Sequence, residues 1–163
     1  MNSYRDLTSY FGLPLADTTF QSYIKSTFID LADYNIANGD YIISEKSGIE
    51  LGFINNEAVV DEDDCLIFEK GNPIFSHVNI YPKSSIKELP LEVNFADSRT
   101  QVINKAGQPT QTSRGDTSFF GRAFLVDNYK VGELIITFDY EPEKENINFI
   151  QIRDNNLVAH LKL

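Results

Sequence analysis

The sequence predicts an α+β fold made of two tandem repeats, each a helix or helix pair packed on an antiparallel sheet. Two observations predict it: helical spacing is followed twice by a series of short strand-like runs, and two similar helix-cap sequences recur along the chain. With 163 residues, 42% of them hydrophobic, the chain can bury a core without disulfides. We expect the first repeat over residues 1–82 and the second over 83–163, and the two can form one compact unit.

The first repeat opens with a short helix within Ser3–Phe11. Asp17 and the two threonines after it supply an N-cap for an amphipathic helix over about residues 18–31, whose apolar residues recur at i, i+3, i+4 and i+7. Strand-like runs follow at residues 41–43, 49–54, 65–68 and 75–81. The last run alternates apolar and polar residues, as a half-buried antiparallel strand does.

The second repeat follows a connector over residues 82–90. Asp97 or Ser98 caps a short helix that ends at Gly107-Gln108-Pro109. The polar residues 110–118 predict a loop. Strands are expected at residues 119–126, 133–140 and 148–153, and the alternating run 157–163 predicts a last strand or edge.

The internal repeat rests on the two cap sequences. Leu15-Ala16-Asp17-Thr18 matches Phe95-Ala96-Asp97-Ser98 at an offset of 80 residues, and Gln21 falls on Gln101 at the same offset. The alternative is chance similarity, because identity between the halves is low. If the repeat is real, the second sheet face of each half either stays exposed or packs against the other half, and this geometry favours a broad concave surface over a deep catalytic cleft.

The residue types that carry catalysis or bind metals do not form a recognisable pattern. His77 and His160 lack a His, Cys or carboxylate at zinc-ligand spacing, and Cys65 follows an acidic run that disfavours a thiolate. No nucleophile elbow, Walker A loop or dinucleotide-binding glycine motif occurs. We therefore expect no catalytic residue, no cofactor and no metal, and an enzyme is the least favoured class.

Charge is unevenly distributed along the chain. The net charge is −10, from 14 basic and 24 acidic residues, and residues 1–82 alone hold 13 acids against 4 bases. Such acidity disfavours binding to nucleic acid or to anionic membranes and favours a basic protein partner. The run Asp61–Asp64 is either a solvated acidic loop or an electrostatic landing site for that partner.

The cell compartment is predicted from what the sequence lacks. The first residues show no apolar stretch behind a basic start, as a signal peptide would, and no apolar run approaches the roughly 20 residues of a membrane span. The single Cys fits a reducing compartment. We expect a cytoplasmic protein with no membrane partner.

The length, the two cycles of helix and strands, and the cap sequences at 15–18 and 95–98 resemble tandem-repeat proteins of the beta-lactamase inhibitory protein type. The second cycle is similar to the single domain of small outer-membrane assembly lipoproteins, and the whole is similar to bacterial immunity proteins that neutralise toxins. The chain departs from the secreted inhibitor in having one Cys, and from the lipoproteins in having no lipobox Cys. What the resemblance implies is a cytoplasmic immunity protein.

We expect a non-enzymatic inhibitor that binds a cognate bacterial toxin domain and blocks it. The alternative is a structural domain, or one that binds a small ligand or peptide, without an inhibitory role. Aromatic residues anchor interfaces and carboxylates meet Lys or Arg on a partner. The expected contact residues are Tyr41, Asp61, Glu62, Asp63 and Asp64, with Asp139, Tyr140 and Glu141 as a second group.

Overall fold

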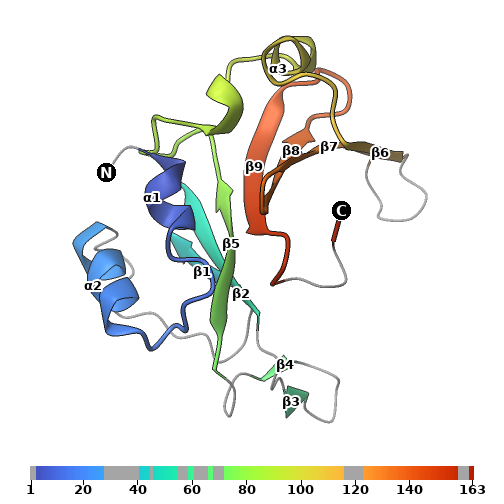
Figure 1. Cartoon of the computed structure of the whole chain (residues 1–163). Helices are drawn as coiled ribbons and strands as arrows, with labels where there is room; N and C mark the ends of the chain where they lie inside the picture. The colour runs from blue at the N-terminus through green and yellow to red at the C-terminus, as the bar shows by residue number, and fades with distance from the viewer. Residues whose placement is uncertain are drawn as a thin grey trace.

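Helices and one large antiparallel sheet make up the fold, so the predicted α+β class is confirmed (Figure 1). This computed structural model describes residues 3–27, 41–44, 46–54, 59–60, 66–67, 72–115, 123–157 and 162–163. The predictions for residues 28–31, for Cys65, for residues 119–122 and for residues 158–161 lie outside the described residues.

Four helical segments lie in the described part of the chain. They are α1 (Tyr4–Thr8), α2 (Thr18–Thr27), the 3₁₀ helix η2 (Pro90–Glu92) and α3 (Arg99–Ala106). Each α-helix begins where a side chain caps it: Ser3 Oγ accepts from Arg5 N–H, Asp17 Oδ1 from Phe20 N–H, and Ser98 Oγ from Gln101 N–H. The predicted helix starts are therefore confirmed.

The strands form one large and one small sheet. Their bounds are β1 (Tyr41–Ser44), β2 (Ile49–Ile54), β3 (Val59–Val60), β4 (Leu66–Ile67), β5 (Ile74–Ile80), β6 (Gln111–Gly115), β7 (Phe124–Val131), β8 (Leu134–Tyr140) and β9 (Ile147–Asp154). The large sheet has seven strands in the order β1-β2-β5-β9-β8-β7-β6, and all its pairs are antiparallel. Strands β3 and β4 pair with each other.

The core lies between one face of the large sheet and the three α-helices. Leu7 of α1, Phe20 of α2 and Val102 of α3 are fully buried in one apolar cluster with the sheet. The Phe20 ring stacks on Phe75 of β5 with centroids 4.8 Å apart. One row across five strands shows how the apolar phases align: Leu51, Val78, Ile152, Ile136 and Tyr129 are successive register partners, and all are buried.

Two strand predictions need correction. The segment predicted as a loop contains the edge strand β6, which lacks an apolar phase because its side chains are mostly exposed and its order comes from backbone pairing with β7. Strand β7 runs to Val131, five residues beyond the predicted end. The alternation there is hidden because the charged Asp127 takes a fully buried core position.

The strands of the two predicted halves separate in the large sheet. Strands β1, β2 and β5 of residues 1–82 lie on one side, β6 to β9 of residues 83–163 lie on the other, and the last strand of each half, β5 and β9, pair at the centre. One continuous sheet therefore crosses the predicted domain boundary at residue 82. The tandem repeat itself stays a prediction.

Candidate functional site

A row of polar side chains crosses the large sheet on the face opposite the core. Its members are register partners on the neighbouring strands β2, β5, β9, β8, β7 and β6, and we call them the polar row. They are Glu50, Asn79, Gln151, Thr137, Asn128 and Gln111. Side chains of register partners on one face lie roughly 5 Å apart, so they can hydrogen-bond directly.

Three hydrogen bonds fix the polar row. Asn79 Nδ2 donates to Glu50 Oε2 at 2.9 Å, and Gln151 Nε2 donates to Asn79 Oδ1 at 3.0 Å. Farther along the same row, the Thr137 hydroxyl donates to Asn128 Oδ1 at 2.6 Å. Because these groups are already oriented, a ligand that contacts them loses less side-chain entropy on binding.

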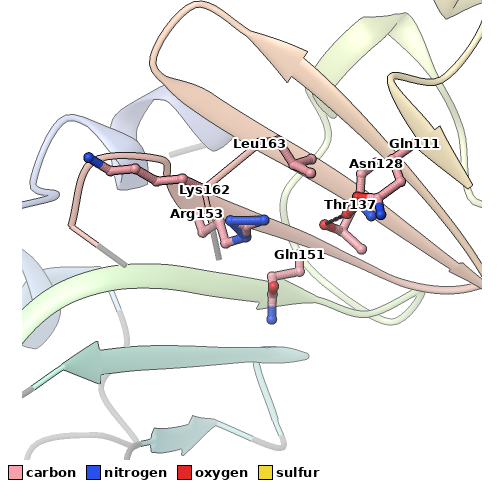
Figure 2. Close-up of a pocket in the computed structure, with 7 residues that line it drawn as sticks. All are labelled: Gln111, Asn128, Thr137, Gln151, Arg153, Lys162 and Leu163. Carbon is pink, nitrogen blue, oxygen red and sulfur yellow. Dashed lines mark hydrogen bonds between the residues drawn. The ribbon is translucent and has the colours of Figure 1, made fainter. Parts of the chain in front are cut away.

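A recess of about 440 Å³ lies between this face and residues 162–163. The described residues that line it are Gln111, Asn128, Thr137, Gln151, Arg153, Lys162 and Leu163. Figure 2 shows the Arg153 guanidinium near Gln151, with Thr137, Asn128 and Gln111 farther along the sheet, while the Lys162 side chain extends away from them. The volume is within the range of small-molecule pockets, and no Asp or Glu is among the described lining residues.

Residues 162–163 are held over the sheet by two side chains. Lys130 Nζ of β7 donates to the main-chain oxygen of Leu163 at 2.7 Å. Asn155, which follows β9 and is 6% exposed, accepts from Leu163 N–H at 3.1 Å and donates to Leu163 O at 3.4 Å. This wall of the recess is thus attached to the strands that form its floor.

His77 and Arg153 are register partners at the centre of the same face. Burial lowers the pKa of both side chains, and the positive charge of Arg153 adds to the effect on His77, whose pKa falls to about 4. His77 is therefore neutral at pH 7, and its Nδ1 lies 2.8 Å from Ser76 Oγ. Its ring occupies the space above Gly52 on β2, where a Cβ atom would overlap with it.

An aromatic pair lies near the far end of this face. The rings of Tyr81 and Phe149 have centroids 5.6 Å apart, and both residues are half-buried. Phe149 is the register partner of Asp139, whose carboxylate accepts a hydrogen bond from Asn148 at 2.8 Å. Aromatic and acidic groups thus adjoin the polar row, as the expected interface chemistry requires.

The predicted contact residues are dispersed along the chain. Tyr41 begins the edge strand β1 and pairs with Gly52, and its side chain lies outside the described part of the structure. Asp61, Glu62, Asp63 and Asp64 also lie outside the described residues. Their role as contacts therefore stays a prediction.

The second predicted group is divided between two faces. Asp139 is half-buried on the face of the polar row, and Glu141 pairs with Lys144 at 3.0 Å on the surface. Tyr140 needs correction as a contact residue: strand alternation turns it into the core, where it is 1% exposed and out of a partner's reach.

A buried polar cluster lies on the core face, under α3. Asp127 is fully buried and accepts hydrogen bonds from Arg99 Nε at 2.7 Å and from Thr112 Oγ1 at 2.6 Å. The hydroxyl groups of Tyr129 and Tyr140 have no hydrogen-bond partner among the described residues. Burial and the charge of Asp127 raise the pKa of Tyr129 to about 12 and that of Tyr140 further, so both phenols stay neutral. We conclude that this cluster holds α3 against the large sheet, through the contact between Arg99 and Asp127.

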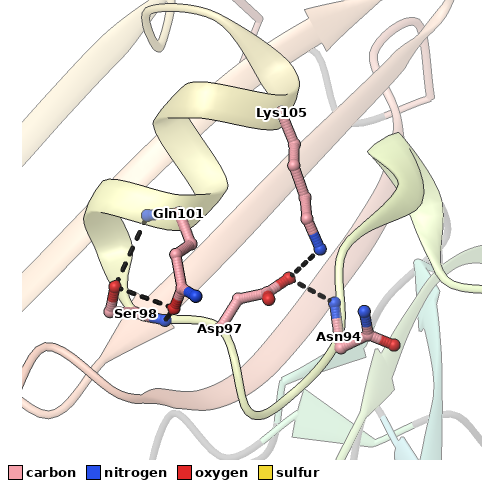
Figure 3. Close-up of polar contacts among 5 residues, drawn as sticks. All are labelled: Asn94, Asp97, Ser98, Gln101 and Lys105. Atoms are coloured by element: carbon pink, nitrogen blue, oxygen red, sulfur yellow. Dashed lines mark hydrogen bonds and ion pairs between the residues drawn. The ribbon is translucent and has the colours of Figure 1, made fainter.

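The two matched cap sequences are used differently. Asp17 caps α2, whereas Ser98 caps α3 in a reciprocal pair with Gln101 (Figure 3). Asp97 instead accepts from Asn94 N–H at 2.6 Å and from Lys105 Nζ at 2.7 Å. Burial acts to raise the pKa of Asp97, but these hydrogen bonds outweigh it and the pKa is lowered.

Sequence reasoning missed the polar row and Arg153. The signal that could have found them is the polar phase of three strands, in which Asn79, Gln151 and Thr137 each follow or precede an apolar core residue. An alternating pattern identifies the exposed phase of each strand, but it does not show which strands are neighbours. The order β2-β5-β9-β8-β7-β6 is what makes these residues one row.

The described residues form neither a metal-binding cluster nor a membrane-spanning helix. Among the described residues, no group of three or more His, Cys, Asp or Glu side chains is placed to hold a metal ion. None of the helices in the described ranges combines the length and the apolar character that crossing a membrane requires.

Comparison of the chain with protein-family models finds no match, and comparison with curated proteins finds none either. Among solved structures, the chain is similar to a DUF4309 family protein (YjgB) from Bacillus subtilis. The identity is 10% over 93% of this chain and 78% of that chain, with a TM-score of 0.39. A likeness at this level supports no inference about fold or function.

Proposed function

We propose that the chain is a non-enzymatic inhibitor, an immunity protein that binds a toxin domain with the polar face of its large sheet. The single observation that supports this best is the polar row, a set of oriented hydrogen-bonding side chains on the face opposite the core. Packing of the core does not require hydrogen-bonded side chains on the opposite face of the sheet. Protein interfaces do use polar groups of this kind for direct hydrogen bonds, and they are also enriched in aromatic residues.

The partner we propose is a protein domain with an excess of Lys and Arg. The chain has a net charge of −10, and 13 of its 24 acidic residues lie in residues 1–82. A negative field of this size accelerates association with a basic partner, and salt weakens the effect. The aromatic pair Tyr81 and Phe149 would then supply the apolar contact at one end of the interface.

The second candidate is a small-ligand or peptide-binding domain without an inhibitory role. One observation favours it: the recess of about 440 Å³ has the volume of a ligand pocket and is lined mainly by polar side chains. A protein interface does not need a recess of this size.

Coexpression tests the inhibitor proposal. We expect a gene beside the one for this chain to encode a basic toxin domain, and expression of that domain to stop growth of a host cell. Coexpression of the wild-type chain should restore growth, and the variants Asp139→Arg and Gln151→Arg should restore it less. Glu88→Arg is the matched control, since Glu88 lies beside α1 and pairs with Arg5. The absence of rescue by the wild-type chain, or equal loss in the control, would contradict the proposal.

A further inference from the structure

We propose that an extended basic segment of the partner adds to the outer edge of β1, as an eighth strand of the large sheet. This inference rests on the proposed function, because it states how the basic partner engages the sheet. Three features of the described residues lead to it: the open edge of β1, the exposed side chain of Ile43 and the negative charge beside them.

Strand β1 lies at one end of the large sheet and, within the described part of the chain, pairs with β2 alone. In an antiparallel pair, alternate residues direct their backbone N–H and C=O groups away from the partner strand, so half of the residues of β1 present these groups outward. Natural sheets protect such edges with charged side chains, proline or bulges. The strand Tyr41–Ser44 contains no charged residue and no proline, and its register with β2 is unbroken. Its sequence therefore leaves the edge open to a further strand.

Ile43 places apolar surface at this edge, on the face of the polar row. Its side chain is 58% exposed, and Val131, 41% exposed, is the other exposed large apolar residue among the described ones. Ile43 is the register partner of Glu50, the first member of the polar row, so both side chains lie on one face. The preceding residue, Ile42, turns into the core and is 4% exposed. An added strand would therefore meet an apolar contact on the face that we propose for the partner.

Negative charge beside Ile43 favours a basic segment. The Glu50 carboxylate lies one strand in from the edge, and residues 1–82 hold 13 acids against 4 bases. A residue opposite Ile43 on the added strand is two strand spacings, about 10 Å, from Glu50. The long stem of a Lys or Arg can cover Ile43 while its charged end approaches the carboxylate. We therefore expect basic residues at alternate positions of the segment, with apolar residues between them on the side of Ile42.

The opposite edge of the sheet, β6, lacks these features. It carries the exposed residue Arg114, and none of its five residues is buried. Positive charge at this edge repels a basic segment. Strand β6 is therefore an internal control, because it is a second edge of the same sheet with a different charge.

NMR of the full ¹⁵N-labelled chain tests strand addition. The probe is the blocked peptide Lys-Val-Lys-Val-Lys-Val-Lys, and the control peptide has Glu in place of Lys. We expect the Lys peptide to shift the amide signals of β1 to saturation. It should also slow hydrogen exchange at least tenfold for the β1 amides that face away from β2. The Glu peptide should bind at least tenfold more weakly, and the amides of β6 should gain no protection.

Two variants and one matched control locate the binding. Ile43→Lys introduces the charge that protects natural edges, so it should weaken binding of the Lys peptide at least tenfold. Val131→Lys makes the same kind of change at the other exposed apolar residue and should leave binding unchanged. Glu50→Gln keeps an acceptor for Asn79 Nδ2 but removes the charge, so it should weaken binding and reduce its dependence on salt.

The same measurements can overturn the proposal. No saturable shift in β1, shifts without slower exchange, equal protection of β6, or wild-type binding by Ile43→Lys would each do so. Protection of the β1 amides that rises with protein concentration in the absence of peptide would identify a second copy of the chain as the occupant, and would also overturn it.

Coexpression with the toxin domain separates this inference from the proposed function. We expect the wild-type chain and Val131→Lys to restore growth, and Ile43→Lys to restore it less. Equal rescue by all three would contradict strand addition and leave the proposed function standing. Absence of rescue by the wild-type chain would contradict the proposed function, whereas the peptide titration would still decide whether β1 takes a basic strand.

Discussion

Arg99 of α3 and Asp127 of β7 are joined by two hydrogen bonds, from Nε to Oδ2 at 2.7 Å and from Nη2 to Oδ1 at 3.1 Å. The two partners differ in solvent contact: the side chain of Asp127 is 0% exposed and that of Arg99 is 23% exposed. Removing Arg99 therefore leaves a fully buried negative charge, whereas removing Asp127 leaves a positive charge that water can reach. The same ion pair is lost in both cases.

We expect Arg99→Met to destabilise the fold by about 3–5 kcal/mol, because it leaves the Asp127 charge fully buried without a cation. Asp127→Asn should cost less, because water can reach the Arg99 that remains. Urea unfolding of both variants measures the two free energies. Equal costs, or a larger cost for Asp127→Asn, would show that the buried charge is not the dominant effect.

His77 makes stability depend on pH in the acidic range. Its pKa is about 4 in the folded chain against 6.5 ordinarily, so between these values the unfolded chain binds a proton that the folded chain does not. Stability must then fall as pH decreases from about 6.5 to 4, by at most about 3 kcal/mol. Comparison with His77→Gln isolates this contribution, because the carboxylates titrate in both proteins. A parallel pH dependence of the two unfolding free energies would contradict the placement of His77.

The contribution of each cap residue to stability should follow the hydrogen bonds that it makes, and not its position in the predicted repeat. Asp17→Ala removes hydrogen bonds to Thr19 N–H and Phe20 N–H, both 2.9 Å long, and Ser98→Ala removes the cap of α3. Each should cost about 1 kcal/mol in thermal or urea unfolding, whereas replacement by Gly should recover part of the loss.

Asp97→Ala should instead remove the contact with Lys105, so combining it with Lys105→Ala should add little to the loss of stability. Full additivity of that pair would mean that the two side chains act separately.

The acidic run at residues 61–64 should act on the rate of association with a basic partner. Replacing Asp61, Glu62, Asp63 and Asp64 with Asn and Ser removes four negative charges. We expect slower association and a weaker dependence of the rate on salt, with a smaller change in the dissociation rate. Stopped-flow measurements at two or more salt concentrations provide the comparison. Unchanged kinetics would remove this run from the interface.

The fold class and most strands could be predicted because apolar residues mark the core phase of each strand. In β8, Ile136, Phe138 and Tyr140 are buried while Thr137 and Asp139 between them are only half-buried, as the pattern requires. Strand β6 could not be predicted in this way, since its order comes from backbone pairing that leaves no mark on side-chain polarity. Asp127 concealed the second half of β7, because a buried ion pair places a charged residue where the pattern expects an apolar one.

The candidate site was less accessible to sequence reasoning than the fold. Arg153 and His77 lie 76 positions apart in the chain and become neighbours only through the pairing of β5 with β9. Tyr140 was wrongly predicted as a contact residue. An aromatic residue beside two acids resembles an interface anchor, but the strand turns this side chain into the core. Polarity indicates which side chains leave the core, but sheet order decides which of them meet.

Hydroxyl-radical footprinting of the chain, free and bound to the toxin domain, tests most directly which face of the large sheet takes the partner. The method reads the accessibility of side chains, and half-buried aromatic residues are available on both sides: Tyr81 and Phe149 on the face of the polar row, Tyr4 and Phe11 on the side of the helices. We predict that binding lowers oxidation of Tyr81 and Phe149 and leaves Tyr4 and Phe11 unchanged. Protection of Tyr4 and Phe11 alone would place the partner on the helices and contradict the proposed binding face.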